Sequence, residues 1–383
     1  MKKGLQKTTT MNNKNRIKLA MSGEKPDRVP VMCEMAKGHI YKHAGLSPID
    51  FWCTPQGFAL GNIKVTDLYR FDGILADTNE MLNFEDISII DWINETDNGH
   101  IAKLNDGCEL FFPHNDNPRF SDDRHNPAPV EICDVDIGKV DSEYSAVTIP
   151  SHHRHFHETI ISQKAESHSV HGEVGTAFGM LLDMTRSYEN GLIALIDNPD
   201  KCIKLMEIFN RYIIDYALYQ CQNGIDALKL SSPFAGSGFI SRDMYVNFVL
   251  PFEQDLINAV KSQFSIPCYL HTCGKIGDRL DLMLKTGIDG IECLDPAPLG
   301  DVDLKHAVDE IGKNVFIKGN LDSVNELVGK ERTELEEIIH ARIEIGKKAE
   351  KGFILSTACS VSPIVPMENI FLLYECAEKY GKY

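Results

Sequence analysis

Hydrophobic residues along this chain gather in short runs that are separated by longer stretches of helical periodicity. Eight runs rich in β-branched and apolar residues begin at Val29, Gly73, Ser169, Ala227, Pro267, Gly290, Asn314 and Phe353. Near-continuous apolar strands that alternate with helices predict a parallel sheet covered on both sides. Eight such units predict an α/β fold, namely a (β/α)8 TIM barrel.

One region departs from this alternation. Asp-Asn-Gly at 97–99 and Asn-Asp-Gly at 105–107 are hairpin-turn signals, with strand-like residues around them. We therefore predict an antiparallel hairpin insertion near 91–136. Insertions on the βα loops of a barrel border its active face, so this one is a candidate wall of a substrate or partner site. A surface elaboration without such a role is the alternative.

The chain divides into a short N-terminal segment and one domain. Residues 1–26 are rich in Lys, Asn and Thr, which predicts a mobile tail leading into a short helix. Residues 27–383 are predicted to form a single barrel domain that carries the insertion. Met1 to Arg16 lack the apolar stretch of a secretory signal, and no apolar run reaches the ~20 residues of a membrane-spanning helix. We therefore expect a cytoplasmic protein.

Charge and cysteine content narrow the classes of partner. The chain has 39 Lys and Arg against 56 Asp and Glu, a net charge of −17. This charge repels polyanions and argues against nucleic acid or an anionic membrane as a partner. Eleven cysteines in an intracellular chain indicate thiols, some of them free to bind metal, rather than a disulfide framework. The oligomeric state stays open, a homodimer being one option.

The strongest chemical signal is His271-Thr272-Cys273 at the end of a predicted strand. Residues two apart on a strand point to the same side, so an imidazole and a thiolate can reach one point, as zinc requires. A buried thiol beside a hydrogen-bonded histidine is the alternative. Glu292 stands inside the next apolar strand, where an uncompensated carboxylate is costly, and Cys359 ends the last strand.

In a barrel these residues come from strands five, six and eight and converge on the C-terminal face, where barrel active sites lie. One nitrogen, two sulfurs and one carboxylate oxygen form a tetrahedral set suited to zinc, and the carboxylate is readily released to a substrate. We predict a catalytic metal site of His271, Cys273, Glu292 and Cys359. A closed structural zinc site is the alternative.

Strand parity separates these residues from nearby thiols. Cys268 and Cys293 are predicted to turn away from the site and to act as small buried apolar residues. The His-rich segment 151–157 is a competing metal candidate, but its polar, Arg-containing composition favours a solvated helix face.

Several further residues near strand ends are candidates for the site. Asp77 and Asn320 are candidate catalytic residues, and Met32, Met35 and Ser231 are candidate substrate-binding residues. Each has an ordinary structural alternative: the polar residues can cap the following helix, and the methionines can belong to the core.

The motifs resemble the uroporphyrinogen decarboxylase superfamily, and within it the corrinoid-dependent methyltransferase branch. The resemblance is carried by Arg-Val-Pro-Val at 28–31, His-Thr-Cys-Gly at 271–274, Gly-Asn-Leu-Asp at 319–322 and Cys359 with the prolines that follow it. It implies zinc bound by His271, Cys273 and Cys359, as in methylcobamide:coenzyme M methyltransferases. Cobalamin-independent methionine synthase is similar too, with a glutamate ligand in the place of Glu292.

The same family includes uroporphyrinogen decarboxylase, and the sequence can be compared with the residues that this enzyme needs. Asp77 falls where that enzyme keeps its catalytic aspartate. The arginines that its family signature places shortly after the first strand are missing, because no Arg follows Arg28 before Arg70. A decarboxylase-like lyase therefore fits the sequence poorly.

The favoured hypothesis is a zinc-dependent methyltransferase that moves a methyl group from a methoxylated, aromatic substrate to the Co(I) corrinoid of a separate protein, as in O-demethylase methyltransferase I. The grounds are the insertion and the aromatic and Met residues near the first strands. No Asp-x-His-x-x-Gly corrinoid motif occurs in the chain, so the corrinoid must be carried by a partner protein. The alternatives are a methylcorrinoid:thiol methyltransferase of the coenzyme M type, a decarboxylase-like lyase, and a non-enzymatic zinc-stabilised barrel.

Overall fold

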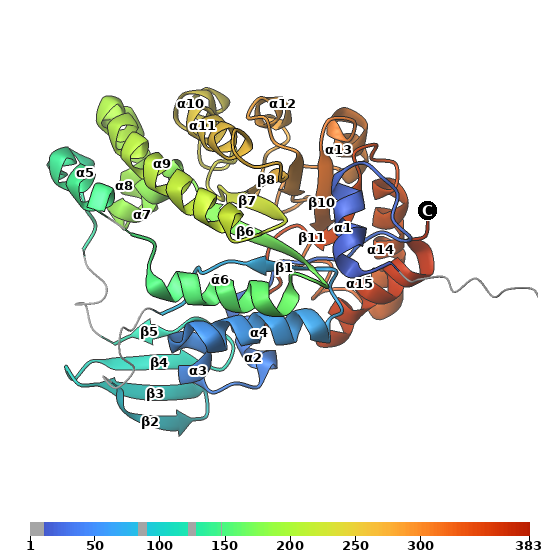
Figure 1. Cartoon of the computed structure of the whole chain (residues 1–383), viewed down its shortest axis with the longest axis horizontal. Coiled ribbons are helices and arrows are strands. Elements are labelled where there is room, and N and C mark those ends of the chain that lie inside the picture. Colours follow the sequence, from blue (N-terminus) through green and yellow to red (C-terminus); the bar gives the residue numbers. More distant parts are fainter. Residues whose placement is uncertain (1–10, 83–89, 122–127, 147) are drawn as a thin grey trace, which may run out of the picture.

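A parallel sheet of seven strands forms the centre of the computed structural model, which describes residues 11–82, 90–121, 128–146 and 148–383 (Figure 1). The strand order is β1-β6-β7-β8-β9-β10-β11, and every neighbouring pair is parallel. The strands are β1 (Gly73–Ala76), β6 (Ser169–Gly175), β7 (Ala227–Ser231), β8 (Cys268–Thr272), β9 (Gly290–Cys293), β10 (Phe316–Leu321) and β11 (Phe353–Thr357). Seven of the eight predicted runs are thus strands.

The eighth run, which begins at Val29, closes the barrel without forming a regular strand. Val31 pairs with Leu355 of β11 in an isolated parallel bridge, and on its other side the Val31 carbonyl accepts the N–H of Asp72, next to β1, at 2.8 Å. Pro30 has no N–H to donate, which interrupts a continuous ladder. The predicted α/β barrel is confirmed, with an extended segment in its first strand position.

Helices surround the sheet (Figure 1). They are α1 (Asn13–Met21), α2 (Lys37–Ala44), α3 (Pro48–Cys53), α4 (Pro55–Leu68), α5 (Ile137–Ala146), α6 (Ser151–Lys164), α7 (Ala177–Thr185), α8 (Tyr188–Asp197), α9 (Pro199–Gln222), α10 (Arg242–Phe248), α11 (Leu250–Lys261), α12 (Leu280–Leu284), α13 (Leu304–Ile311), α14 (Arg332–Gly346) and α15 (Met367–Tyr380). Many begin where a side-chain oxygen accepts a free backbone N–H, as Thr176 does at α7 and Asp303 at α13. None of the described helices is long and apolar enough to cross a bilayer.

Helix α1 packs against the N-terminal end of the barrel. Its Ile17 and Ala20 are fully buried and belong to a separate apolar cluster with Met32, Tyr269 and Phe316, from three other parts of the barrel. The predicted short helix is therefore present, and it seals the barrel floor. The predicted mobile tail falls largely on residues 1–10, which lie outside the described residues.

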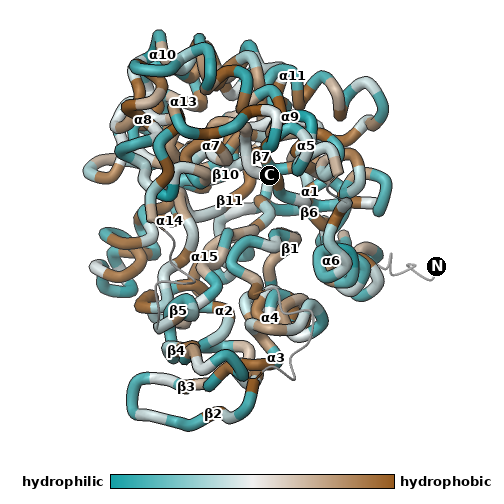
Figure 2. Tube along the Cα trace, turned by 90° about the vertical axis from the view of Figure 1, so that its left-hand side faces the viewer, coloured by the Kyte–Doolittle hydropathy of each residue, from teal (hydrophilic) through white to brown (hydrophobic). Residues whose placement is uncertain are grey.

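The insertion between β1 and β6 contains a four-stranded antiparallel sheet, which lies beside α2 and α3 at one end of the molecule (Figure 2). Its strands are β2 (Ile90–Thr96), β3 (Gly99–Leu104), β4 (Glu109–Pro113) and β5 (Arg119–Phe120), and a short 3-10 helix, η2 (Ile132–Asp134), follows. Gly38 of α2 lies so close to the backbone of Asn115 that a Cβ would meet its carbonyl oxygen at 2.7 Å. The antiparallel insertion was predicted, and it supports the helix that follows the first strand segment.

Candidate metal centre

Three predicted ligands converge at the C-terminal end of the barrel. The His271 Nε2 atom lies 3.3 Å from the Cys273 Sγ atom, which in turn lies 3.5 Å from the Cys359 Sγ atom. His271 lies in β8, Cys273 comes just after that strand, and Cys359 follows β11. One imidazole nitrogen and two thiol sulfurs within 4.8 Å of one another form a donor set that fits zinc.

Glu292 lies on the other side of the imidazole. Its Oε2 atom is 3.2 Å from His271 Nδ1, whereas the two cysteines face Nε2. Its second oxygen forms an ion pair with Lys318. The structure therefore brings Glu292 to the predicted site but places it behind His271, and its role as a fourth metal ligand stays a prediction.

Further charged side chains fill the barrel interior below the metal donors. Lys229 of β7 forms an ion pair with Glu34, and its Nζ lies 3.5 Å from both Glu173 and Glu292. Lys229 and Lys318 are completely or almost completely buried. Buried charges are tolerated only when they are paired, and each of these cations contacts a carboxylate. Neither lysine was predicted, although a lysine inside an apolar strand carries the same signal that singled out Glu292.

The charges shift the pKa values of this interior strongly. Burial raises the pKa of Glu173 to about 7, and burial together with Lys229 lowers the pKa of Lys318 to about 7. Burial and Lys229 also act to lower the pKa of His271, but Glu34 and the hydrogen bonds to the two cysteines outweigh them and raise it to about 10. Without a metal, His271 is thus held as an imidazolium beside two thiols. To bind a metal ion, His271 would have to release a proton.

Cys293 and Asp295 lie beside Cys273, contrary to the predicted orientation of Cys293. The three side chains offer ligand atoms within 4.8 Å of one another, and Cys293 Sγ donates to Asp295 Oδ2 at 3.3 Å. Cys293 has φ 81° and Leu294 φ 57°, a left-handed backbone that ends strand alternation. Asp295 is buried beside the donor set, and sequence reasoning missed it.

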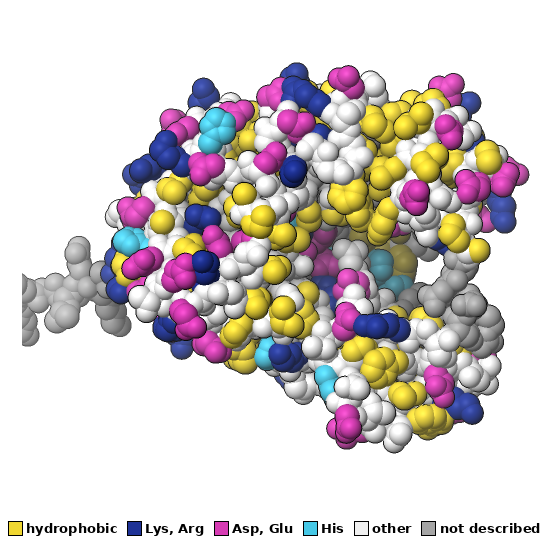
Figure 3. Space-filling view, turned by 180° about the vertical axis from the view of Figure 1, so that it is seen from behind, with side chains coloured by type: hydrophobic (Ala, Val, Ile, Leu, Met, Phe, Trp, Pro, Cys, Tyr) yellow, Lys and Arg dark blue, Asp and Glu magenta, His cyan; other side chains and the backbone are white. Residues whose placement is uncertain are grey.

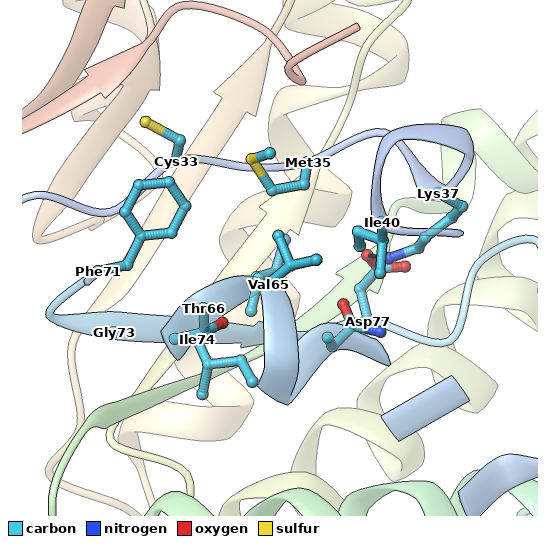
Figure 4. A pocket seen from close by; sticks show the side chains of 12 residues that line it. Cys33, Met35, Lys37, Ile40, Val65, Thr66, Phe71, Gly73, Ile74 and Asp77 are labelled. Carbon is cyan, nitrogen blue, oxygen red and sulfur yellow. Dashed lines mark hydrogen bonds and ion pairs between the residues drawn. The ribbon is translucent and has the colours of Figure 1, made fainter. Parts of the chain in front are cut away.

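Asp77 occupies the end of β1, where it forms a buried ion pair with Lys37 of α2 (Figure 4). Its second oxygen accepts the N–H of Asn79 at 2.8 Å, a contact within a turn rather than the helix cap given as the structural alternative, because residues 77–82 form no helix. Met35 and Asp77 line a cavity of about 20 Å³, which has room for roughly one water molecule.

The remaining predicted residues divide between the two ends of the barrel. Ser231 ends β7 directly opposite His271, and Asn320 is buried near the end of β10, where its Nδ2 donates to the Leu294 carbonyl at 2.8 Å. Met32 is fully buried in the apolar cluster of the barrel floor, with Ile17 of α1. The prediction that Met32 binds substrate is therefore wrong, because its side chain packs at the end opposite to the metal donors.

The His-rich segment forms the first turns of α6. Within it, His157 is buried and its Nε2 lies 2.9 Å from the Tyr216 hydroxyl. Groups of three potential ligands occur, among the described residues, only around His271 and Cys273. The structure thus supplies no second metal donor set at 151–157.

Figure 3 shows a hollow between the insertion sheet and the helical part of the molecule above it, with acidic and histidine side chains inside. The side chain of Glu34, which is 23% exposed, is the most accessible of the interior carboxylates that contact Lys229.

The chain belongs to the uroporphyrinogen decarboxylase (URO-D) family, whose model matches residues 105–380. This family assignment confirms the resemblance that the motifs suggested. The match covers the strands from β4 onward and includes all the metal donors.

Curated relatives within the family carry two kinds of name. The chain is 28% identical over 176 residues to "Methylcobamide:CoM methyltransferase MtbA" of Methanosarcina acetivorans, which covers 46% of this chain and 48% of that protein. It is 30% identical over 184 residues to a "Uroporphyrinogen decarboxylase" of Prochlorococcus marinus, covering 47% of this chain and 49% of that protein. The chain thus matches about half the length of these relatives.

A solved structure extends the similarity to the whole chain. A "methyltransferase from Methanosarcina mazei" superimposes with a TM-score of 0.68 and 17% identity, covering 97% of this chain and 99% of that one. At this identity the likeness concerns the fold, which includes the barrel and the segments on both sides of it.

Proposed function

We propose that this protein is a zinc-dependent methyltransferase that transfers a methyl group from the methylcorrinoid of a partner protein to a small thiol. The observation that carries the proposal is the donor set of His271 Nε2 and the sulfurs of Cys273 and Cys359 at the barrel mouth. Three protein donors would leave one position of a tetrahedral zinc ion free for a substrate, as in catalytic rather than structural zinc sites.

Bound zinc lowers the pKa of a coordinated thiol, so that a thiolate nucleophile exists at neutral pH. The residues of the chain supply the remaining requirements. His271, Cys273 and Cys359 would hold the ion at the mouth, and Glu292 lies behind the imidazole, beside His271 Nδ1. Attack of the thiolate on the methyl carbon forms a C–S bond and breaks the Co–C bond, whose electron pair stays on cobalt as Co(I).

The thiol direction replaces our sequence-based preference for a methoxylated aromatic donor. Two methanosarcinal relatives are named as methylcobamide:CoM methyltransferases, and this name supports the alternative that the sequence left open. The prediction of a pocket for an aromatic substrate relied partly on Met32, which lies in the barrel floor. We keep O-demethylation as an arm of the test.

A corrinoid protein is the partner that this reaction requires. The metal donors lie at the C-terminal end of the strands, and His271 is only 3% exposed. The corrinoid must therefore present its methyl group into the mouth from above the strand ends. We propose this docking by similarity to the relatives whose names include methylcobamide.

The test combines metal analysis with methyl transfer in both directions. The protein is purified without chelator, its zinc content is measured, and it is mixed with methylcobalamin and a panel of small thiols. We expect about one zinc per chain and loss of the methyl-Co(III) absorption that depends on the thiol and on the metal. Formation of methyl-Co(III) from a Co(I) corrinoid and a methoxyarene would instead establish O-demethylation. Decarboxylation of a porphyrinogen that survives chelation would overturn the proposal.

A further inference from the structure

His271, Glu292 and Lys318 form one row across three neighbouring strands. The parallel pairing of β8 with β9 sets His271 beside Glu292, and the pairing of β9 with β10 sets Glu292 beside Lys318. Residues in register point to the same side of a sheet, so this pairing places three polar side chains next to one another inside the barrel. Their contacts follow the row, from the Lys318 ammonium to the Glu292 carboxylate and on to His271 Nδ1.

The row is closed to solvent. The exposed fractions are 3% for His271 and 1% for both Glu292 and Lys318. Water therefore cannot satisfy these groups, and each depends on its neighbour in the row. Lys318 occupies one oxygen of Glu292, which leaves the other oxygen, Oε2, to face the imidazole.

The direction of the last contact determines which histidine nitrogen is available. A carboxylate only accepts hydrogen bonds, so the imidazole must present Nδ1–H to Glu292. In a neutral imidazole the lone pair then resides on Nε2, the atom that faces Cys273 at 3.3 Å. The row thus selects both the orientation and the tautomer that a metal ion at the cysteines needs.

We propose that Glu292 and Lys318 are positioning residues, which hold His271 with its Nε2 lone pair directed at the metal position. This inference rests on the proposed function only in requiring a metal at that position. It assigns Glu292 to the support of a ligand rather than to the ligand set, and it gives Lys318, which the sequence analysis did not single out, a specific task. Carboxylates behind metal-bound histidines raise metal affinity in this way, and their loss typically costs 10–100-fold.

Neighbouring charged groups determine how much zinc affinity is lost when Glu292 or Lys318 is replaced. Glu34 Oε2 lies 3.7 Å from His271 Nδ1, and Lys229 holds Glu34 in an ion pair of its own. Glu34 can therefore replace part of the contact when Glu292 is removed. Lys318 pairs with the Oε1 atom of Glu292, whereas Lys229 lies 3.5 Å from Oε2, so Lys229 is less well placed to take over the contact that Lys318 makes.

The experiment measures zinc affinity by chelator competition and the visible spectrum of the Co(II)-substituted protein. The variants are Lys318→Met, Glu292→Leu and Glu292→Gln, whose amide oxygen can still accept from Nδ1. Lys164→Met is the matched control, since Lys164 is a buried lysine that pairs with Asp67 on α4, away from the mouth. Lys318→Met and Glu292→Leu should weaken zinc binding about 10–100-fold, and Glu292→Gln should recover part of that loss. The control should bind zinc like the wild type.

The Co(II) spectrum separates a positioning residue from a ligand. If the proposal holds, all folded variants keep the d–d bands and the thiolate-to-cobalt charge-transfer bands of the wild type at saturating metal. A shift of the d–d bands in Glu292→Gln that is absent from Lys318→Met would show Glu292 to be a ligand and overturn the proposal, as would unchanged zinc affinity in both Lys318→Met and Glu292→Leu. A wild-type protein that binds no metal would instead overturn the proposed function, and this inference with it.

Discussion

The Cys273 sulfur lies 3.5 Å from the sulfur of Cys359, a residue 86 positions further along the chain. Cys273 follows β8 and Cys359 follows β11, so barrel closure rather than local sequence creates the pair. Both side chains are partly exposed, unlike most cysteines of the chain. Hydrogen bonding to Cys273 and burial raise the pKa of Cys359, so a metal must displace a proton from this thiol.

We expect Cys359→Ser to lose zinc while it keeps the barrel. The donor set would retain only His271 Nε2 and one sulfur, which is too few for tight binding. Cys359 is partly exposed and is not among the residues of the main buried core. Metal content falls from about one zinc to well below one per chain, and the circular dichroism spectrum stays that of the wild type.

Cys268→Ala is the control for this variant. Cys268 begins β8, the strand that carries His271, but it is fully buried in the main core rather than among the metal donors. The Cys268→Ala substitution should lower the free energy of unfolding and leave the zinc content unchanged. Unfolding of Cys359→Ser would support a structural zinc, and wild-type zinc content in that variant would contradict the ligand assignment.

The placement of Met32 gives a second prediction. Met32 is fully buried with Ile17 and Phe316 in the floor cluster, so Met32→Ala removes packed apolar volume at the end of the barrel away from the mouth. We expect a loss of about 2–5 kcal/mol in the free energy of unfolding. Urea denaturation measures this loss. KM for the methyl acceptor should stay unchanged at a temperature where the variant is folded, and a raised KM would restore Met32 to the substrate site.

Much of the barrel could be predicted from the sequence because strands buried on both faces leave continuous apolar runs. The run at Val29 shows the limit. Its composition resembles that of the other seven, but Pro30 reduces its pairing to isolated bridges. Which end of the barrel Met32 faces could not be predicted, because that depends on α1 sealing the floor.

Parity along a strand predicted that His271 and Cys273 share a side, since it requires only an extended backbone. The same parity rule failed at Cys293, where φ is 81°, because the sequence does not predict a left-handed backbone conformation at a non-glycine residue. The contact between Lys318 and Glu292 depends on the register of β9 against β10, which the sequence does not state. The residues of the site could thus be found from the sequence more readily than their partners.

Asp72 holds the first strand segment against the barrel floor. It is fully buried, and its carboxylate accepts from Arg16 Nη1 at 2.5 Å, from Arg28 Nη1 at 2.8 Å and from the Val31 N–H at 2.7 Å. Asp72→Asn removes the charge that compensates two buried guanidinium groups. We expect a loss of about 3 kcal/mol in the free energy of unfolding, because each arginine keeps a second, more exposed carboxylate partner.

Urea denaturation and zinc analysis check this prediction together. Zinc content should stay that of the wild type, because Asp72 precedes β1 at the end of the barrel where α1 packs. Asp309→Asn, which breaks an exposed pair with Lys305, is the control and should leave the unfolding midpoint unchanged. An unfolding curve of Asp72→Asn that matches the control would show that the buried arginines need no compensation.

Glu253 gives the protein a pH-dependent stability that is independent of the metal donors. It is 1% exposed on α11, and its Oε2 accepts from the Tyr245 hydroxyl at 2.7 Å. Burial raises its pKa from 4.5 to about 7. Between these values the folded state retains a proton that the unfolded state has lost, so stability falls as pH rises from about 4.5 to about 7.

Glu253→Gln should remove this dependence, because an amide does not titrate. A difference of about 2.5 pKa units corresponds to about 3 kcal/mol, so the free energy of unfolding of the variant, relative to wild type, should rise by about 2–3 kcal/mol between pH 5 and pH 8. Urea denaturation at both pH values measures the change. Glu334→Gln, on the exposed side of α14, is the control and should show no such rise. A constant difference between Glu253→Gln and wild type would mean that Glu253 ionises alike in the folded and unfolded states.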